Sequence, residues 1–409
     1  IGMGVRYAET RQVRDFFLDQ IYRRESGRSA FYEVSYEGLV HIQDLLGESG
    51  DRNFAEAIED YWKTIQDLAN DPSSAVTQGI FISKAQTLIE RATNVYNSLV
   101  DYQGNLNNEV KKDVDKINDY GKRLVELNNQ IAKIECGGIE HANDFRDERN
   151  YILDQLSELC DISYTEDPDG YVSVQIEGVD FVKRTTFYEM KLDEYGYYTP
   201  FWPHIIESTV NAEGEVVYTP EEVAKGRVFN LDREISTEAN TDVGRLRSIL
   251  YARGDHPADC SELEDVEEYN RTIAPSIIMN VQAEFDKLIS SIALEINKIL
   301  KDAGYTDGTA NTDNSVFVRI NTEGMSDTEG WHVGNIAVNQ NFLKQPALLN
   351  FVKGDDEVDH ETATKLKEAF EKEEYTLNPN TGKRSAFKDF YGDLVIQVSN
   401  TGEVNKLLY

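Results

Sequence analysis

The sequence predicts an α+β fold: an elongated bundle of long, coiled-coil-like helices with one small inserted β domain. In the first third of the chain, apolar residues recur every three or four positions, as they do on one face of a helix. After Cys160 they alternate with polar residues, and helical spacing returns from Ala274. The 409 residues are enough for two or three domains, each with a core.

The first predicted helices lie near the start of the chain. From Arg11, the segment RQVRDFFLDQIYRRE places Val13, Phe16, Phe17 and Ile21 on one face. A second helix, NFAEAIEDYWKTIQDLAN, is expected to stop at Asp71-Pro72. From Leu106 to Ile134 the apolar positions recur every 3.5 residues on average, the period of supercoiled helices.

A small β domain is predicted at residues 163–243. YVSVQIEGVDFV, Tyr171 to Val182, alternates apolar and polar residues beside the turn EDPDGY. The segments EGEVVYTPEE and GRVFNL add short β-like runs between Gly and Pro residues. Because helical patterns lie on both sides, we expect this domain to be inserted into a discontinuous helical domain of residues 1–162 and 244–409.

The second half of the helical domain begins with a long helix. Ala274 to Gly304 keeps one apolar stripe, and Gly304 is expected just beyond its C-terminus. Short strands are expected near residues 315–340, in SVFVRI and NIAVN, followed by helices in HETATKLKEAFEKEE and in the last segment from Ser385.

The charge balance argues against several classes of partner. The chain has 74 acidic and 41 basic residues, a formal net charge of -33. Nucleic-acid phosphates and anionic membrane surfaces would be repelled, so we expect neither as a partner. No apolar run reaches the length of a membrane helix, and the first residues do not resemble a cleaved signal peptide.

The three cysteines, Cys136, Cys160 and Cys260, show neither metal-site nor redox spacing, and we expect structural roles for them. His360-Glu361 begins HETAT, but Thr364 replaces the second histidine of a zinc-protease helix, so we expect His360 to be an exposed residue at a helix start.

Other motif matches are incomplete. The loop Asp307 to Asn314 lacks the residue order of an EF-hand, so we expect a turn-rich connection. Ser385 and Lys388 have S-x-x-K spacing without the accompanying K-T-G or S-D-N motifs. The histidines are scattered, and we therefore predict no catalytic, cofactor-binding or metal-binding residues and no cofactor, although the spacing of carboxylates in space stays open.

The segment ANDFRDERNYILDQLSEL concentrates charge before an apolar stripe. We interpret it as a capped, salt-bridged helix start in which Asn143 is the N-cap and Asp144 and Asp147 lie in the first turn. Arg146 is expected to pair with a neighbouring residue or with another helix. The predicted buried stripe comprises Tyr151, Ile152, Leu156 and Leu159, with Asp154 and Glu158 outside.

This segment, continued through CDISYTEDPDGYVSVQIEGVDFV, resembles the flagellar hook-associated protein 1 family, in which an N-D-x-R-D-x-R helix start leads into a β domain. Five other stretches resemble further family segments in the same order. They are GMGVRYAETRQVRDFFLDQIYRRE, the helix pair around Asp71-Pro72, DVGRLRSILYARGD, NIAVNQNFLKQPALL and AFKDFYGDLVIQVSN. The resemblance spans nearly the whole chain. The family's terminal helices are expected before Ile1 and after Tyr409.

The resemblance implies a non-catalytic axial component of the bacterial flagellum at the hook-filament junction, with a role in flagellum assembly and motility. Implied partners are the hook protein, a second junction protein called hook-associated protein 3, further copies of the chain in a helical array, and an export chaperone. The implied location is extracellular, after export through the flagellar type III system.

Two other readings remain open from the residues. An acidic enzyme would need a concave carboxylate cluster or a completed metal site. A surface adhesin or antigen would use the β domain, where Tyr195, Tyr197, Tyr198, Phe201 and Trp202 lie close together in sequence. Such clusters are more often core, but a solvent-exposed patch would indicate binding.

Overall fold

The computed structural model describes residues 16–47, 53–137, 141–193, 195–212, 214–310, 314–320, 330–354 and 357–409. The chain divides into two compact units. Unit 1 comprises Ile1–Tyr36, Leu106–Tyr251 and Asn405–Tyr409, and unit 2 comprises Glu37–Asn105 and Ala252–Val404. No helix in these described stretches combines the length and apolar character that crossing a membrane requires.

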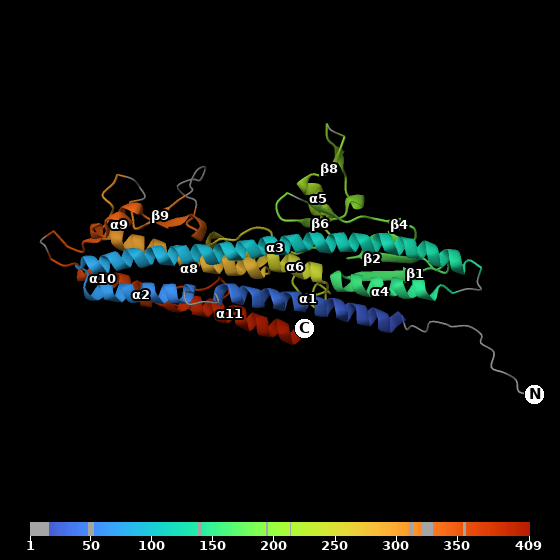
Figure 1. Cartoon of the computed structure of the whole chain (residues 1–409), viewed down its shortest axis with the longest axis horizontal. Helices are drawn as coiled ribbons and strands as arrows, with labels where there is room; N and C mark the ends of the chain where they lie inside the picture. The colour runs from blue at the N-terminus through green and yellow to red at the C-terminus, as the bar shows by residue number, and fades with distance from the viewer. Residues whose placement is uncertain are drawn as a thin grey trace, which may run out of the picture. The chain divides into compact units, whose positions relative to one another are not determined.

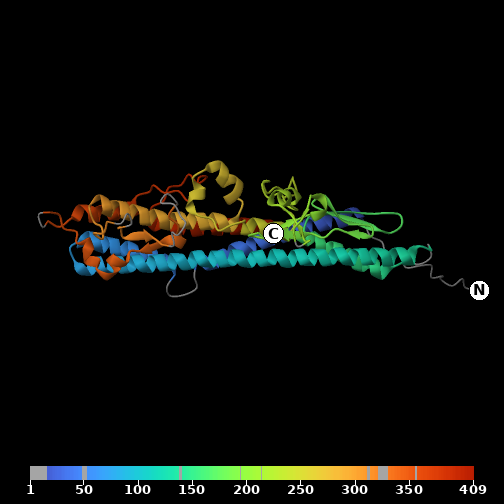
Figure 2. The same cartoon turned by 90° about the horizontal axis from the view of Figure 1, so that it is seen from above.

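Helices dominate both units (Figure 1). The α-helices are α1 (Phe16–Gly47), α2 (Phe54–Asn70), α3 (Ala75–Glu135), α4 (Asn143–Leu159), α5 (Pro220–Gly226), α6 (Arg245–Arg253), α7 (Val266–Glu268), α8 (Ile277–Asp302), α9 (Gln340–Lys344), α10 (His360–Glu371) and α11 (Phe387–Leu408). Short 3-10 or π helices are η1 (Pro203–Ile205), η2 (Cys260–Leu263), η3 (Tyr269–Ile273), η4 (Val333–Asn335) and η5 (Pro346–Leu349). Figure 2 shows α3, which contributes residues to both units, as one unbroken ribbon.

The strands are short and antiparallel. They are β1 (Ile162–Glu166), β2 (Val172–Ile176), β3 (Val179–Lys183), β4 (Thr186–Phe187), β5 (Lys191–Asp193), β6 (Thr199–Phe201), β7 (Thr209–Val210), β8 (Val216–Val217), β9 (Phe317–Arg319) and β10 (Ile336–Val338). β1 to β4 form one sheet in sequence order, and β5-β6, β7-β8 and β9-β10 form two-stranded sheets. The predicted α+β class, a helical bundle with a small β segment, is confirmed.

Local sequence signals set several helix ends. The Asn53 side chain accepts a 2.8 Å hydrogen bond from the Glu56 N–H at the start of α2, and the helix ends before Asp71-Pro72 as predicted. The Ser276 hydroxyl accepts a 3.3 Å bond from the Met279 N–H at the start of α8. Gly304 follows α8 with φ of +89°, so its predicted place beyond the C-terminus is confirmed.

Of the two further β-like runs that were expected, EGEVVYTPEE is right where Val216–Val217 form β8 and wrong from Pro220 on, and GRVFNL is wrong. Residues 220–226 form the short helix α5, because the Thr219 side chain accepts from the Glu222 N–H and Pro220 occupies the first helical position. GRVFNL forms no strand. Its only ladder contact among the described residues is the isolated bridge between Arg227 and Phe201.

In unit 1 the predicted stripe of α3 is covered by the rest of the unit. Its residues from Leu106 to Ile131 are at most 5% exposed, apart from Tyr120, which like Ile134 is half-buried. The sheet packs closely on α3, because a Cβ at Gly121 would lie 2.5 Å from both the Phe181 and Phe187 rings. The stripe therefore forms a core within the subunit.

Amide side chains of α3 also bind the backbone of the β segment. The Asn128 Nδ2 group donates to the carbonyls of Val172 and Arg184, both at 2.8 Å, and its Oδ1 atom accepts from the Val172 N–H. Asn118 binds both backbone groups of Met190 at 2.9 Å. These bonds satisfy backbone groups that would otherwise be buried without partners.

Unit 2 is held by aromatic and amide contacts. Phe54 packs against Phe285 at 5.0 Å and Tyr391 at 4.7 Å between ring centroids, and Trp62 stacks on Phe370 at 5.7 Å. Strands β9 and β10 form where short strands were expected.

The two compact units divide the chain differently from the predicted domains. Residues 163–243 belong to unit 1 together with α4 and the second part of α3. That they form a separable inserted domain stays a prediction.

Candidate functional site

The charged start of α4 is the site that the sequence singled out. The Arg146 guanidinium donates to Glu135 of α3 at 2.6 and 2.8 Å and to Glu166 of β1 at 2.7 Å. The expected pairing of Arg146 with another helix is therefore confirmed. The 2.6 Å and 2.7 Å contacts are charge-assisted hydrogen bonds, which are stronger than neutral ones.

Arg149 completes this cluster from inside the unit. It is 2% exposed and donates to the Gly170 carbonyl at 2.7 Å, to Glu166 at 3.0 Å and to Asn128 at 3.3 Å. The cluster thus joins α3, α4 and the β1–β2 hairpin through permanently charged groups.

Two details of the predicted helix start were wrong. Asn143 is the first helical residue, and the N-cap is Ala142, which makes no side-chain cap bond. Glu135 from α3 is the carboxylate that serves this helix start, because its Oε1 atom accepts the Ala142 N–H at 2.9 Å. Tyr151 is 62% exposed, whereas Ile152, Leu156 and Leu159 are buried as predicted.

The electrostatics of the cluster suit a structural role. Hydrogen bonds from Arg146 lower the pKa of Glu135 to about 2. Bonds from Arg123 likewise lower the pKa of Glu148. Carboxylates held in the ionised form by guanidinium groups are poor proton donors or acceptors near neutral pH. The arrangement fixes segments to one another and offers no general acid or base.

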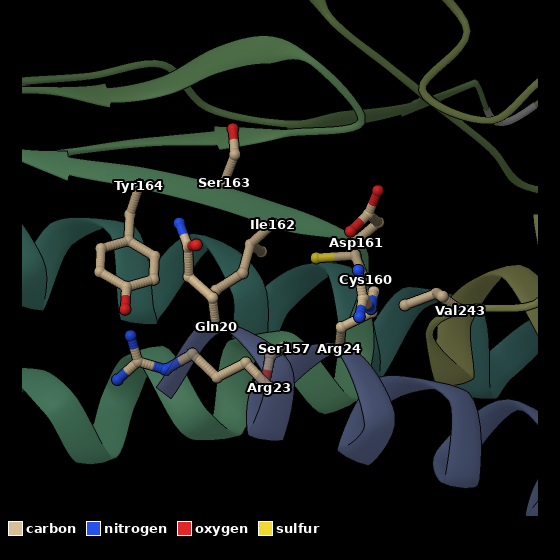
Figure 3. A pocket seen from close by; sticks show the side chains of 10 residues that line it. All are labelled: Gln20, Arg23, Arg24, Ser157, Cys160, Asp161, Ile162, Ser163, Tyr164 and Val243. Atoms are coloured by element: carbon tan, nitrogen blue, oxygen red, sulfur yellow. The ribbon is translucent and has the colours of Figure 1, made fainter. Parts of the chain in front are cut away.

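A small cavity lies where α1 approaches the start of β1 in unit 1 (Figure 3). Its volume is about 170 Å³. Arg23 and Tyr164 lie at one end, with the Arg23 guanidinium 4.5 Å from the ring centroid, and Cys160 and Asp161 line the other end. The Arg23 Nε atom donates to Asp154 at 2.8 Å. Burial raises the pKa of the Cys160 thiol, so it is not poised as a nucleophile.

Sequence reasoning missed a close backbone crossing next to this cavity. A Cβ at Gly27 of α1 would lie 2.5 Å from the Ser157 carbonyl oxygen, and the Gly244 N–H donates to the Gly27 carbonyl at 2.9 Å. Gly244 itself has φ of +94° and approaches Cys160. A glycine inside a helical pattern was the available signal for this crossing.

Buried Asp242 reinforces the crossing, and the sequence analysis also missed it. Its Oδ2 atom accepts hydrogen bonds from Arg28 at 2.9 Å and Thr237 at 2.7 Å, and its side chain is fully buried. The segment after the β region is therefore tied to α1 by both backbone and side-chain bonds.

Among the described residues of unit 2, one set brings potential metal-ligand atoms together. Atoms of Asp259, Cys260 and Asp286 lie within 4.8 Å of one another. However, Asp286 already accepts from the backbone N–H groups of Cys260 at 2.8 Å and Val333 at 2.5 Å. Burial raises the pKa of Asp286 to about 6 and also raises the pKa of the Cys260 thiol, which disfavours the thiolate that a metal needs. The geometry is that of a capping carboxylate.

The remaining motif residues lie apart from one another. His360 is exposed at the start of α10, as expected, and the N-cap of that helix is Asp359. Ser385 pairs its backbone with Tyr375, and its hydroxyl donates to Asp393. Part of the loop from Asp307 to Asn314, like Val13 in the first predicted helix, lies outside the described residues.

The aromatic group of the β segment divides into core and surface. Trp202 is fully buried and Phe201 is 3% exposed, whereas Tyr195 is 84% exposed. Beyond them stands the β7-β8 hairpin, with exposed Val210, Val216 and Val217. These exposed valines form an apolar surface on the hairpin.

Comparisons with known proteins place the chain. The sequence model of the flagellar hook-associated protein FlgK helical domain matches residues 39–317, more than half of the chain. The chain belongs to the FlgK family. A FlgK-family protein named flagellar hook-associated protein 1 from Bacillus subtilis is 28% identical over 170 residues, which are 42% of this chain and 33% of the relative.

A second relative of the same name, from Escherichia coli, is 22% identical over 188 residues, which are 46% of this chain and 34% of the relative. This FlgK-family chain thus matches about a third of the length of its curated relatives. The solved structure of the flagellar hook junction protein FlgK from Burkholderia pseudomallei matches with a TM-score of 0.53 and 17% identity. That match covers 74% of this chain and 47% of the other, and it supports the shared fold.

Proposed function

We propose that this FlgK-family chain is a non-catalytic structural component of the bacterial flagellum that joins the hook to the filament. The family match over residues 39–317 is the observation that carries the proposal. The names of the relatives support the flagellar reading over that of an adhesin or antigen.

The interior of unit 1 is consistent with a mechanical role. Ion pairs of Arg23, Arg146 and Arg28 tie α1 to α4, α4 to α3, and α1 to the segment preceding α6. Arg149 ties α4 to β1, and both Arg23 and Arg149 are 2% exposed. Such bonds fix the orientation of one element on another. A subunit of an axial array must hold its shape while neighbours pull on it.

The proposed partners are the hook protein on one side, hook-associated protein 3 on the other, and copies of the chain in a helical array. Repeated head-to-tail contacts generate such an array when the rotation between subunits does not close a ring. The proposed route to this extracellular position is the flagellar type III system with the help of an export chaperone.

The experiment uses the full-length gene in its own bacterium. We expect a strain without it to lose normal motility, and a tagged copy to restore motility and lie at the base of each filament. An Arg149→Ala copy should restore motility less well, whereas Arg24→Ala, which removes an exposed arginine, should restore it fully. A tagged protein that covered the cell body, with motility intact in its absence, would favour an adhesin and contradict the proposal.

A further inference from the structure

Unit 1 contains a groove of about 420 Å³ beside the β7-β8 hairpin. It is lined by Leu192, Asp193, Tyr195, Phe201, Val216, Val217, Tyr218 and Val223. These residues come from β5, β6, β8, the segments next to them, and α5, and Figure 1 shows the hairpin with β8 standing off β6 and α5. Most of the lining is apolar, and Asp193 is the one charged residue among the described residues that line it.

The groove meets β8 along the edge of that strand. Successive residues of a strand point to opposite faces, yet Val216 and Val217 both line the groove. No residue of β7 is part of the lining, so the groove lies against the edge of β8 that is remote from β7. Leu192 and Asp193 of β5 line the other side together with Phe201 of the paired strand β6, so on that side the groove lies over the β5-β6 pair.

Backbone hydrogen bonds identify which peptide groups face the groove. In the β7-β8 hairpin, the Asn211 N–H donates to the Glu215 carbonyl at 2.9 Å and the Thr209 hydroxyl to the Val217 carbonyl at 3.4 Å. Because alternate residues of an antiparallel strand bond to the same neighbour, Glu215 and Val217 face β7. The N–H and C=O groups of Val216 therefore point to the open edge.

The β5-β6 pair forms the opposite wall of the groove. The Pro200 carbonyl accepts from the Val228 N–H at 3.0 Å, and the Trp202 N–H donates to the Gly226 carbonyl at 2.8 Å, so these two residues face away from β5. Thr199 and Phe201 then face β5, where they pair with Asp193 and Lys191. Leu192, between them, points its backbone groups outward.

We propose that this groove binds an extended segment of a partner protein as a strand added to the open edge of β8, over the β5-β6 pair. Among the described residues, the outward backbone groups of Leu192 and Val216 have no hydrogen-bond partner. Edge strands of this kind are templates for strand addition. The rise per residue, the distance between neighbouring strands and the distance between packed sheets together give a strand residue about 160 Å³. The groove therefore accommodates roughly three residues.

The charge around the groove specifies the partner's chemistry. Asp193 lines it and exposed Glu215 precedes Val216, while one cation, the Lys191 ammonium, lies 5.8 Å from the ring centroid of the lining residue Tyr218. The whole chain carries a net charge of -33. We therefore expect apolar residues that pack on Phe201 and Val223, flanked by Lys or Arg. A second copy of this acidic chain is disfavoured as occupant, because its carboxylates would repel Asp193 and Glu215.

The test uses the whole chain and the fluorescein-labelled peptide Lys-Val-Thr-Val-Thr-Val-Lys in anisotropy titrations. We expect one-to-one binding that weakens with salt. A peptide with Glu at both ends should bind at least tenfold more weakly. Val216→Pro, which removes the outward N–H, should weaken binding at least tenfold. Val210→Pro, which alters the cross-strand partner of Val216 on the opposite edge, should change it less than twofold.

Hydrogen exchange with the same peptide provides a measurement that does not depend on variants. Slower exchange of the Val216 amide in the complex would support the proposal. Equal effects of the two proline variants, tight binding of the Glu-flanked peptide, or dimers that Val216→Pro dissociates would each overturn it. The binding measurement needs only the isolated chain. A negative result would therefore contradict the proposed peptide site without contradicting the proposed junction function.

Discussion

Units 1 and 2 are held together by different chemistry. In unit 1, arginines such as Arg149 and Arg23 bind carboxylates and carbonyls on segments far away in sequence. In unit 2, aromatic rings pack on one another, and the buried carboxylate of Glu284 accepts bonds from the neutral amides of Asn378 and Gln397. Charge-assisted bonds are directional and depend on both partners, whereas apolar packing is not directional.

The comparison implies that unit 1 is specified by a few irreplaceable contacts. Removing one partner of a buried ion pair leaves the other desolvated and unpaired. Unit 2 should tolerate single polar changes better, because its stability is distributed over packed surface. Matched substitutions in the two units test this contrast.

The largest expected difference is between two buried polar residues. Arg149→Met should lower the free energy of unfolding of unit 1 by about 3 kcal/mol, because the Gly170 carbonyl and buried Asn128 lose a donor. Glu166 also loses a donor but keeps its bond from Arg146. Glu284→Gln in unit 2 should cost less than about 1 kcal/mol, since the glutamine oxygen still accepts from neutral amides. Urea unfolding with hydrogen exchange on peptides of each unit measures both. Equal losses would contradict the comparison.

These contacts show where sequence reasoning stops. The ends of α2 and α8 follow from nearby residues such as Asn53, Pro72 and Gly304, so they were predictable. Asn143 was assigned the N-cap wrongly, because the carboxylate that serves this helix start is Glu135 of another helix. Spatial proximity of that kind leaves no local pattern.

The edge of β8 escaped prediction for another reason. Two residues, Val216 and Val217, are too few to establish an alternation, and the following Pro220 begins a helix. The burial of Arg149 was also not predictable, because a charged residue three positions after Arg146 in a helix start normally lies on the surface.

The next difference concerns two glycines with positive φ. Gly244→Ala in unit 1 should cost about 3 kcal/mol, because the new Cβ would lie 2.7 Å from the Cys160 Cα atom, which cannot move alone. Gly254→Ala in unit 2 should cost about 2 kcal/mol, because its closest neighbour is the flexible end of the Met279 side chain. Thermal and urea unfolding of each variant give the values.

Gly178→Ala is the matched control for these two substitutions. Gly178 has φ of +80° and open space around its added Cβ, so its cost of about 1 kcal/mol measures backbone strain alone. If Gly244→Ala cost no more than this control, the close crossing of α4 and the Gly244 segment would not contribute to the stability of unit 1.

The smallest expected effect is the response of unit 1 to acid. Hydrogen bonds from Arg146 lower the pKa of Glu135 to about 2 from its ordinary 4.5. A carboxyl with a lowered folded-state pKa adds stability above its unfolded pKa, and this contribution disappears as the pH falls from about 4.5 through about 2. Glu135→Gln should remove about 1 kcal/mol of unfolding free energy at pH 6 and almost none at pH 2, after allowance for partial solvent screening. Glu148→Gln is the matched control, because its ion pair with Arg123 is 40% exposed on the carboxylate side and should contribute little at either pH. Urea unfolding of the three proteins between pH 2 and pH 6 measures the difference. A pH profile for Glu135→Gln that runs parallel to the unsubstituted chain would mean that Arg146 orients α4 without stabilising it through charge, and the contrast between the units would then depend on Arg149 alone.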